Sequence, residues 1–231
     1  MIDSNRHRFY LLQLLKEIYT DIEIGSYLGF KGGTAMMFFY DLPRLSIDLD
    51  FDLLYPDREG IVYEKIRTIL LKYGIIHDEA KKFHGPLLVL DYGSGERKLK
   101  VEISNREFNS RYEIKNLLGI DMLVMVPEDM FAHKLCALLD RRTLANRDLF
   151  DCWFFMTNHT PINTEIVESR MQISLSDYLD KCIQQLESRK QQSTLSGIGE
   201  LLDPDLKQFV KTKLLAETIT LMKFYREFPL T

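Results

Sequence analysis

Acidic and apolar residues alternate without interruption between Ile47 and Leu53. If this segment is a β-strand, successive side chains point to opposite faces, so Asp48, Asp50 and Asp52 share one face. Carboxylates two residues apart on a strand lie only about 7 Å from each other, and their repulsion opposes folding unless a positive charge lies nearby. A divalent cation meets that need, and Mg²⁺ combines carboxylate ligands with water and substrate phosphates. The segment therefore predicts metal-assisted chemistry on a phosphorylated substrate.

Two other interpretations of the acidic segment remain open. A calcium-binding loop would use Asp48, Asp50 and Asp52 at positions one, three and five and Glu59 at position twelve, but position six requires glycine and is Leu53. A solvated edge strand is the second interpretation, and the poor β-propensity of aspartate counts against it.

A Gly-Gly pair precedes the acidic segment. The sequence Lys-Gly-Gly-Thr at 31–34 follows a predicted short strand at 26–30, and Thr34 is expected to cap a short helix that ends before Pro43. Backbone N–H groups at the start of a helix bind phosphate oxygens, and glycine lets the backbone approach them closely. A Gly-Gly pair alone is more often a turn, and the missing G-K-[ST] ending excludes a P-loop.

A third acid, Glu102, lies on a predicted strand at 98–104. It points away from the apolar residues of that strand. Glu102 therefore either completes a metal site or pairs at the surface with Lys98 or Lys100.

Elements of two kinds must position these residues. Besides the strands above, a strand is expected at 87–92, and a turn at Gly93-Ser94-Gly95-Glu96 joins it to the strand at 98–104 in a hairpin. Another short strand is expected at 123–126. Helical spacing predicts helices at 4–22, 64–73, 128–142, 146–157, 175–190 and 205–227. The chain is therefore expected to be α+β, with an α/β core and its N-terminal helix at 1–126 and a helical portion at 127–231 packed on that core.

Four ordered blocks, spanning about residues 25–155, resemble the polymerase-β-like nucleotidyltransferases and, within them, the AbiEii toxin family that also includes the MenT-like toxins. The blocks are Lys31-Gly32-Gly33-Thr34; Arg44, Ser46, Asp48, Asp50 and Phe51; Lys100-Val101-Glu102-Ile103; and Glu128 to Leu135 with Arg141, followed by Arg147 to Asp151. The order makes the match more specific than any single block. The resemblance implies a mixed sheet with flanking helices, followed by an all-helical C-terminal portion.

The resemblance also implies a reaction. In such enzymes two Mg²⁺ ions bind a nucleoside triphosphate, activate an attacking hydroxyl and stabilise the pyrophosphate as it leaves. Asp48 and Asp50 match the family's metal-binding pair, and Glu102 matches its third metal-binding acid, which also receives the hydroxyl proton. Asp52 has no role in the family and is expected to be a solvated neighbour.

The family's nucleotide-binding positions fall on the segments before the acids. The residues expected to hold the triphosphate are Lys31, Gly32, Gly33, Thr34 and Ser46.

Further site residues are expected in the helical portion. Lys134, Ala137 and Arg141 form one helical stripe, which is either a solvated face or, as the family implies for Lys134, a triphosphate contact. Asp148 and Asp151 share a face of the next helix, where they either cap it or pair with Arg147 and Lys134, and the family ties Asp148 to activity. Lys134 and Asp148 are therefore added to the catalytic residues.

The resemblance makes transfer RNA the leading acceptor, growth arrest the outcome, and an antitoxin encoded by a neighbouring gene the expected partner. Two other enzymatic acceptors remain open, namely a protein and a small molecule such as an antibiotic. A non-catalytic nucleotide- or RNA-binding protein is the alternative of a different class. Three intact, mutually repelling acids argue against it, because binding alone gives no reason to keep them.

Composition limits the class of protein. With 30 Lys and Arg against 34 Asp and Glu in 231 residues, the chain is neither a polycationic nucleic-acid coat nor a disordered acidic tail. Such a total still allows a local RNA-binding face. Cys136, Cys152 and Cys182 have no metal or redox spacing and are expected to be reduced core residues. Without a signal-peptide pattern or a long apolar run, the protein is expected in the cytoplasm and not in a membrane.

Overall fold

The computed structural model describes residues 3–93, 95, 97–141, 143–189 and 195–230. The chain divides into two compact units. The sheet unit contains Met1–Asp41, Leu45–Glu107 and Tyr112–Met125, and the helical unit contains Leu42–Arg44, Phe108–Arg111 and Val126–Thr231. Two short segments of the N-terminal half, 42–44 and 108–111, thus belong to the helical unit.

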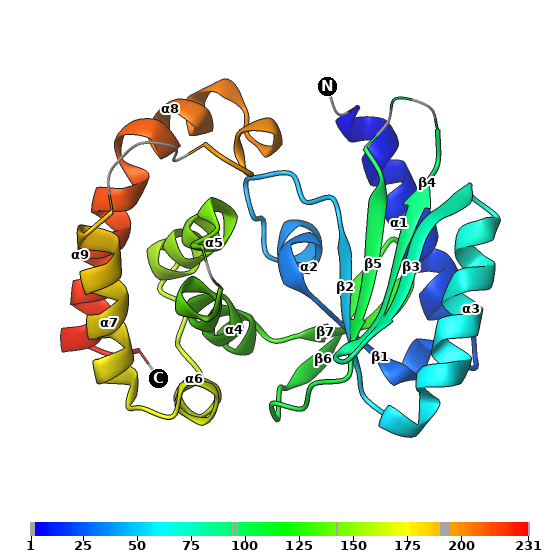
Figure 1. Ribbon diagram of the computed structural model, residues 1–231, viewed down its shortest axis with the longest axis horizontal. Coiled ribbons are helices and arrows are strands. Elements are labelled where there is room, and N and C mark those ends of the chain that lie inside the picture. Colours follow the sequence, from blue (N-terminus) through cyan, green and yellow to red (C-terminus); the bar gives the residue numbers. More distant parts are fainter. Residues whose placement is uncertain (1–2, 94, 96, 142, 190–194, 231) are drawn as a thin grey trace. The chain divides into compact units, whose positions relative to one another are not determined.

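Within the described residues, seven strands form one mixed sheet in the order β3-β4-β5-β2-β1-β7-β6 (Figure 1). The strands are β1 (Leu28–Lys31), β2 (Leu49–Leu53), β3 (Ile75–Lys82), β4 (Gly85–Asp91), β5 (Leu99–Ser104), β6 (Tyr112–Leu117) and β7 (Ile120–Met125). The central strand β2 is antiparallel to β1 and parallel to β5. This arrangement places the predicted Asp and Glu blocks on the adjacent strands β2 and β5, and the Gly-Gly block directly after β1, the strand on the other side of β2.

The sheet unit also contains the α-helices α1 (Ser4–Thr20), α2 (Gly32–Phe39) and α3 (Glu59–Leu71). Figure 1 shows α1 and α3 on the same side of the sheet. From α1, the ring of Tyr19 lies 6.3 Å from that of Phe51 on β2, and the Phe30 ring on β1 lies 5.4 Å from Phe51. The apolar side of the alternating segment is therefore the core side, as its pattern predicts.

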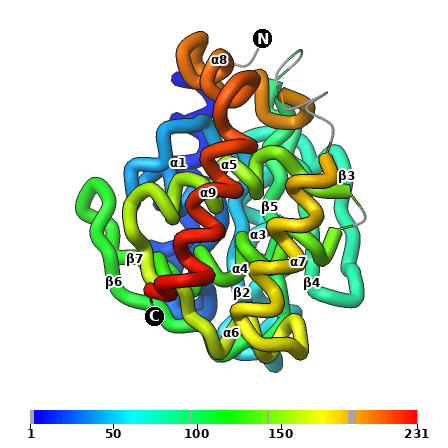
Figure 2. Tube along the Cα trace, turned by 90° about the vertical axis from the view of Figure 1, so that its left-hand side faces the viewer, coloured from blue at the N-terminus to red at the C-terminus, as the bar shows by residue number. Residues whose placement is uncertain are grey.

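The helical unit contains α4 (Pro127–Asp140), α5 (Asn146–Thr157), α6 (Thr164–Met171), α7 (Leu175–Glu187), α8 (Pro204–Thr212) and α9 (Leu214–Glu227). Figure 2 shows α9, in red, running beside α5 and α7. Its core includes Phe131, whose ring stacks on Phe155 at 5.2 Å and meets Tyr225 edge-on at 5.9 Å. The three cysteines are buried with free thiols, as predicted.

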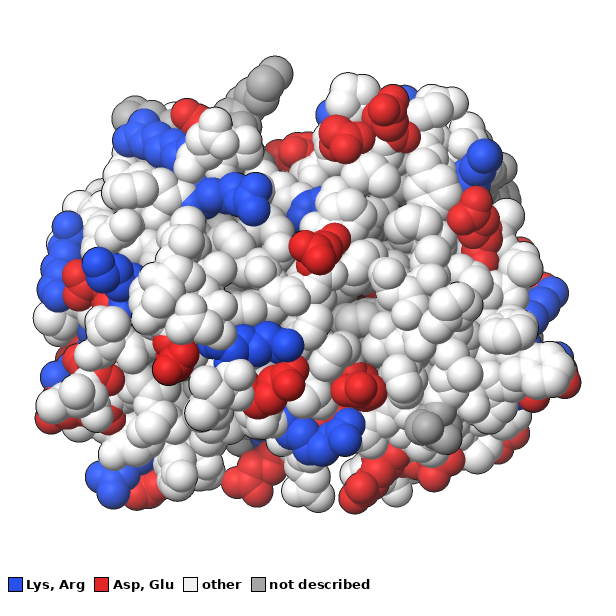
Figure 3. All heavy atoms as spheres, turned by 180° about the vertical axis from the view of Figure 1, so that it is seen from behind, with Lys and Arg blue, Asp and Glu red and all other residues white. Residues whose placement is uncertain are grey.

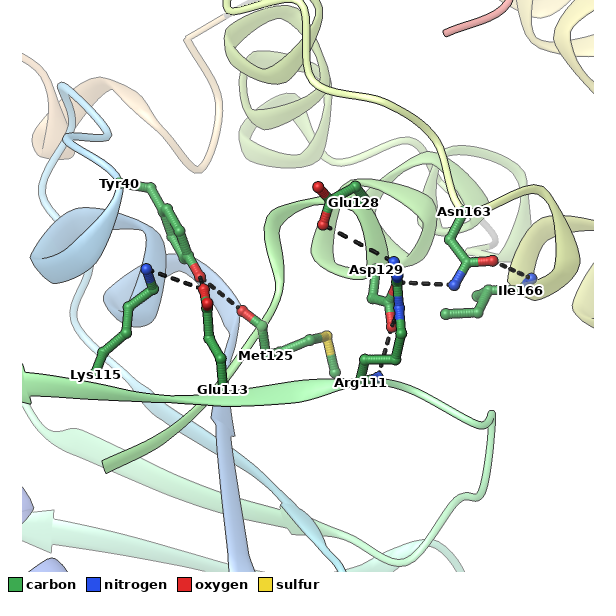
Figure 4. Close-up of polar contacts among 9 residues, drawn as sticks. All are labelled: Tyr40, Arg111, Glu113, Lys115, Met125, Glu128, Asp129, Asn163 and Ile166. Carbon is green, nitrogen blue, oxygen red and sulfur yellow. Dashed lines mark hydrogen bonds and ion pairs between the residues drawn. The ribbon is translucent and has the colours of Figure 1, made fainter. Parts of the chain in front are cut away.

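Polar contacts fix the segment 108–111 within the helical unit (Figure 4). The Arg111 backbone N–H donates to Asp129 Oδ2 at 2.6 Å, and its guanidinium donates to Asp129 Oδ1 at 2.8 Å. Asn163 also donates to Asp129 Oδ1 at 2.7 Å, while its own carbonyl oxygen caps α6 at Ile166. Asp129 is completely buried, so these donors replace the water that its charge has lost.

A second group of contacts in Figure 4 lies within the sheet unit. The Tyr40 hydroxyl, just after α2, lies 3.0 Å from Met125 O and 3.2 Å from Glu113 Oε1. The ammonium group of Lys115 lies over the Tyr40 ring and pairs with Glu113 at 2.9 Å. These contacts connect the end of α2 to β6 and β7.

The predicted α+β fold is confirmed, with a mixed sheet, flanking helices and several C-terminal helices. Among the α-helices and strands of the described residues, β3, β6 and α6 were not predicted. The single helix predicted at 205–227 is wrong, because the chain leaves helical geometry at Lys213 and forms two helices. The predicted hairpin of β4 and β5 is present, and its turn residues Ser94 and Glu96 lie outside the described residues.

In the part of the chain that the structure describes, no helix is both long enough and apolar enough to span a bilayer.

Candidate active site

The acidic segment enters the sheet one residue after Asp48. The predicted strand begins at Leu49 instead of Ile47, because side chains bind the two preceding carbonyl groups. The buried His7 ring on α1 donates through Nε2 to Ile47 O at 2.9 Å, and the Thr34 hydroxyl donates to Asp48 O. The peptide groups on both sides of Asp48 are thus held by side chains, which fixes that residue at the start of β2.

Thr34 does not cap α2 as predicted. The helix begins at Gly32, with Lys31 at the N-cap, so Thr34 is already inside the first turn. Its hydroxyl instead bonds Asp48 O and lies 3.0 Å from the hydroxyl of Ser46. Thr34 and Ser46 are both buried, and they connect the Gly-Gly block to the acidic block.

Three charged residues form a row across adjacent strands. Glu102 on β5 is the Cα partner of Asp50 on β2, and Lys31 on β1 is the partner of Asp50 on its other side. Side chains of directly opposed residues point from the same face of a sheet. One sheet face therefore presents Glu102, Asp50 and Lys31 side by side.

Gly32 closes this row at the start of α2. Its φ is +80°, in the region that favours glycine, and a Cβ atom at this position would lie 2.5 Å from Asp50 Oδ2. The missing side chain therefore lets the helix start lie directly against the Asp50 carboxylate. The N–H groups of the first turn of α2 have no intrahelical acceptors, and such groups bind anions.

Lys100 lies among the three predicted metal-binding acids. Its ammonium nitrogen is 3.2 Å from Glu102 Oε2 and 3.9 Å from Asp48 Oδ2. Burial alone lowers the pKa of Lys100, but the carboxylates of Asp50, Asp48 and Glu102 outweigh it and raise that pKa above its ordinary value. Burial conversely raises the pKa of Glu102, and Lys100 outweighs it, so the Glu102 pKa is lowered. Glu102 is thus ionised beside the Lys100 ammonium group.

As these side chains stand, no three carboxylate, imidazole or thiol groups of the described residues converge on one ion position. The donor set nevertheless fits a hard cation, because carboxylate oxygens are the ligands that Mg²⁺ prefers. The Lys100 ammonium group lies near both Asp48 and Glu102 and supplies the positive charge there.

Asp52 is not the solvated neighbour that the sequence suggests. Its residue is only 7% exposed, and its carboxylate accepts hydrogen bonds from Lys31 Nζ and the Tyr112 hydroxyl. The third acid of the alternating segment is therefore internally paired.

The helical unit contains its own buried ionic cluster. Arg44 binds Asp151 in a bidentate pair, with Nε–Oδ1 and Nη2–Oδ2 distances of 2.7 Å. Lys134 Nζ, from α4, lies 2.8 Å from Asp151 Oδ2 and 3.2 Å from Asp148 Oδ1 on α5. Arg141 Nε lies 3.0 Å from Asp148 Oδ2, an ion pair without hydrogen-bond geometry. All five charged groups thus form one network.

Electrostatics keep this cluster ionised. Burial raises the pKa of Asp151, but Arg44 and Lys134 outweigh burial and lower that pKa to about 2. Burial lowers the pKa of Lys134, but Asp151 and Asp148 outweigh it and raise that pKa. Lys134 is therefore a charged ammonium at neutral pH.

The predicted site residues accordingly form two sets. The sheet unit brings together Asp48, Asp50, Glu102, Lys31, Gly32, Gly33, Thr34 and Ser46. The helical unit pairs Lys134 with Asp148.

Several contributors were missed because their partners are distant in sequence. The buried His7, 40 residues before its partner Ile47, gave no signal beyond a polar residue on an amphipathic helix. Arg44 was noticed as part of a block, but its pairing with Asp151 joins residues 107 positions apart.

Known structures share the fold of this chain. MenT4, a nucleotidyltransferase toxin from Mycobacterium tuberculosis, aligns with a TM-score of 0.63 at 17% identity, over 96% of this chain and 84% of that one. JHP933 from Helicobacter pylori aligns with a TM-score of 0.57 at 21% identity, over 97% and 92% of the two chains. A second crystal structure from Helicobacter pylori, described in terms of nucleotidyltransferase function, gives 0.60 at 20% identity over 97% and 95%. These likenesses show a shared fold.

No curated protein matches the chain. A family model does, over residues 13–222, and its description is "Nucleotidyl transferase AbiEii toxin, Type IV TA system". The match includes both predicted sets of site residues. The chain therefore belongs to the AbiEii family of nucleotidyltransferase toxins.

Proposed function

We propose that the protein transfers a nucleoside monophosphate from a nucleoside triphosphate to a hydroxyl group of cytoplasmic transfer RNA, and that it uses Mg²⁺. The observation that carries this proposal is the row of Glu102, Asp50 and Lys31 beside Gly32. Two acids suited to a hard cation, a lysine and the N–H groups of a helix start lie there on four neighbouring elements, β5, β2, β1 and α2. These are the groups needed to hold a metal-bound triphosphate.

Asp48, Asp50 and Glu102 would hold the metal, in two positions as the family resemblance implies. When bound, Mg²⁺ supplies positive charge that stabilises the transferring phosphoryl group and the leaving pyrophosphate. Lys100, which already neutralises these acids, would have to move within the site to admit it.

The chain's own residues would bind and orient the substrates. The first-turn N–H groups at Gly32 and Gly33, together with Lys31, hold the triphosphate oxygens. Thr34 and Ser46 support this contact by fixing Asp48 against α2. The attacking hydroxyl oxygen forms a bond to the α-phosphorus while the bond to pyrophosphate breaks, and the hydroxyl proton passes to Glu102.

Lys134 and Asp148 are proposed as further residues required for transfer. The ammonium group of Lys134 is partly exposed and pairs with two acids, Asp148 and Asp151, which orient it. An ammonium group has three N–H donors, so one remains for a phosphate oxygen. Its role would be a second contact to the triphosphate, and Asp148 would position it.

Transfer RNA is proposed as the acceptor from the family resemblance, and the charge distribution is compatible with it. Lys and Arg are interspersed with Asp and Glu on the face shown in Figure 3. Such a surface supports contacts to a few phosphates of a defined RNA and disfavours nonspecific coating. Family membership also implies an antitoxin partner. We place its gene beside this one and expect unopposed activity to arrest growth.

The proposal is tested by incubating the protein with Mg²⁺, total transfer RNA and each of the four α-labelled nucleoside triphosphates. One of them is expected to label RNA, and Asp48→Ala, Asp50→Ala and Lys134→Met are each expected to abolish labelling. Asp57→Ala is the matched control, because Asp57 is an exposed acid paired only with its neighbour Arg58 in the contacts described. It should label RNA like the unaltered protein.

Label on a protein or on a small molecule instead of RNA would contradict the proposed acceptor. Absence of any label, combined with undiminished growth arrest by the Asp48→Ala variant, would contradict transfer itself. Expression with and without the neighbouring gene tests the antitoxin, which should restore growth.

A further inference from the structure

Asp52 carries a buried negative charge that the proposed metal site does not use. Its carboxylate is engaged at both oxygens: Lys31 Nζ binds Oδ1, and the Tyr112 hydroxyl donates to Oδ2 at 2.6 Å. Burying a carboxylate costs free energy unless it is paired and hydrogen-bonded. Asp52 therefore depends on Lys31 and Tyr112, and it fixes their side chains in return.

Strand register explains how these three residues meet. In the pairing of β1 with β2, Lys31 is opposite Asp50 and Gly29 is opposite Asp52. The side chain of Lys31 therefore leaves the sheet on the acidic face and reaches diagonally from Asp50 to Asp52. Lys31 is also close enough to Glu102 to help lower the pKa of that acid. The ammonium group is thus part of the proposed active face.

Gly29 leaves room for the ring of Tyr112. A Cβ atom at Gly29 would overlap the Tyr112 ring. Any larger residue there would displace the ring and with it the hydroxyl that binds Asp52. One arrangement therefore fixes the Lys31 side chain: Gly29 on β1 leaves room for Tyr112 on β6, and Tyr112 and Lys31 both bind Asp52 on β2.

We propose that Asp52 and Tyr112 are positioning residues that hold the Lys31 ammonium group on the acidic face of the sheet, near Asp50 and Glu102, for contact with the phosphates of the nucleotide. This inference rests on the proposed nucleotide binding at Lys31. Lysine has a long, flexible side chain, and fixing it before the nucleotide arrives reduces the entropy lost on binding. Tyr112 acts on the nucleotide only through Asp52 and Lys31.

The test is a double-mutant cycle on nucleotide binding in the full-length protein. Dissociation constants are measured for each of the four nucleoside triphosphates with Mg²⁺, using Tyr112→Phe, Asp52→Asn, Lys31→Met and the double variant Lys31→Met/Tyr112→Phe. Tyr112→Phe is expected to weaken binding by about threefold to tenfold, the effect of losing one hydrogen bond of ordinary strength, because Tyr112 acts on the nucleotide only indirectly. In the Lys31→Met background the same change should have an effect of less than about twofold, because its target is gone.

A merely structural role for Tyr112 makes a different prediction. It would weaken binding by the same factor in both backgrounds, and that result would overturn the inference, as would unchanged binding by Tyr112→Phe alone. Tyr73→Phe is the matched control, since it removes a tyrosine–glutamate hydrogen bond elsewhere in the sheet unit and should leave binding unchanged. In turnover, Tyr112→Phe should raise KM for the nucleotide more than it lowers kcat.

Binding and transfer are measured separately, so the two proposals can fail separately. Coupling between Lys31 and Tyr112 in a protein that labels no acceptor would retain the positioning role and reject nucleotidyl transfer. Transfer to RNA without that coupling would reject the positioning role alone.

Discussion

At the scale of single residues, Asp151 combines complete burial with two cationic partners. Arg44 reaches both of its oxygens, and Lys134 reaches one. Its pKa of about 2 lies below the ordinary value of 3.8 because the two cations outweigh the effect of burial. Protons therefore bind preferentially to the unfolded chain, and the ionised carboxylate stabilises the folded state.

We expect Asp151→Asn to lower the free energy of unfolding at pH 7 by about 3–5 kcal/mol, the usual cost of breaking a buried ion pair. In the unaltered protein the contribution is fully present above about pH 5 and declines as pH falls through 3.8 toward 2. The difference between the two proteins should therefore shrink over that interval. Urea unfolding at several pH values measures it, through the fluorescence of Trp153 on α5.

Asp57→Asn is the comparison for this experiment, since Asp57 is exposed and should change stability little at any pH. A difference between Asp151→Asn and the unaltered protein that stays constant from pH 7 to pH 2 would contradict the role given to the carboxylate.

Residue types and spacing in short local patterns pointed to the acids and the glycines as candidate site residues, and the family resemblance added Lys134. Burial of Asp52 was not predictable in that way. Its partners Lys31 and Tyr112 lie 21 and 60 positions away, and only strand pairing brings them to one place. The sequence therefore indicated which residues carry charge but not which charges neutralise each other.

At the scale of elements, the corner between β1 and α2 depends on Gly32. Alanine there would face both a positive φ of +80° and an Asp50 oxygen 2.5 Å from its Cβ. We expect Gly32→Ala to destabilise the protein by about 1–3 kcal/mol and to abolish transfer, because the helix start or Asp50 must move. Melting temperature and RNA labelling measure the two effects.

Gly60→Ala provides the matched change. Gly60 lies on α3, and a Cβ atom there meets nothing within 4 Å. Alanine at that position should keep activity and leave stability unchanged or raise it by up to about 1 kcal/mol. Full activity of Gly32→Ala would refute the close packing of α2 against Asp50.

Elements with a clear apolar period were predicted well, and those at the edges of the sheet were not. Both β3 and β6 are edge strands without a buried residue. The sequence of β3 lacks the alternation that marks a half-buried strand, and that of β6 alternates only over 112–115. The start of β2 was misplaced for a related reason, since hydrogen bonds from His7 and Thr34 replace sheet pairing at residues 47 and 48. Such bonds are tertiary and leave no local pattern.

At the scale of the whole molecule, the chain supplies the helical unit from three places in the sequence. Arg44 comes from the first, Arg111 from the second, and both bind acids that are completely buried, Asp151 and Asp129. A fragment of residues 126–231 would retain these acids without their arginines. Asp151 would keep Lys134 and Asp129 would keep Asn163, but removing one partner of a buried ion pair still costs about 3–5 kcal/mol, comparable to the whole stability of a typical domain.

We therefore expect the isolated 126–231 fragment to lack cooperative unfolding and to show reduced helical circular dichroism compared with the full chain. The same fragment carrying Asp129→Asn and Asp151→Asn should recover part of the helical signal, because the buried carboxylates that lack their arginine partners have been removed. A cooperatively folded unaltered fragment would show that the two arginines are dispensable to the helical unit.

The pairing of Arg44 with Asp151 also has a consequence for inheritance. The two positions are separated by 107 residues, yet a change at one leaves a buried charge at the other. Substitutions there should appear jointly among descendants of this gene, and recombination between the two codons should be harmful when it mixes divergent copies. The loop before the acidic strand and the helix that bears Asp151 are thus expected to evolve as a linked pair.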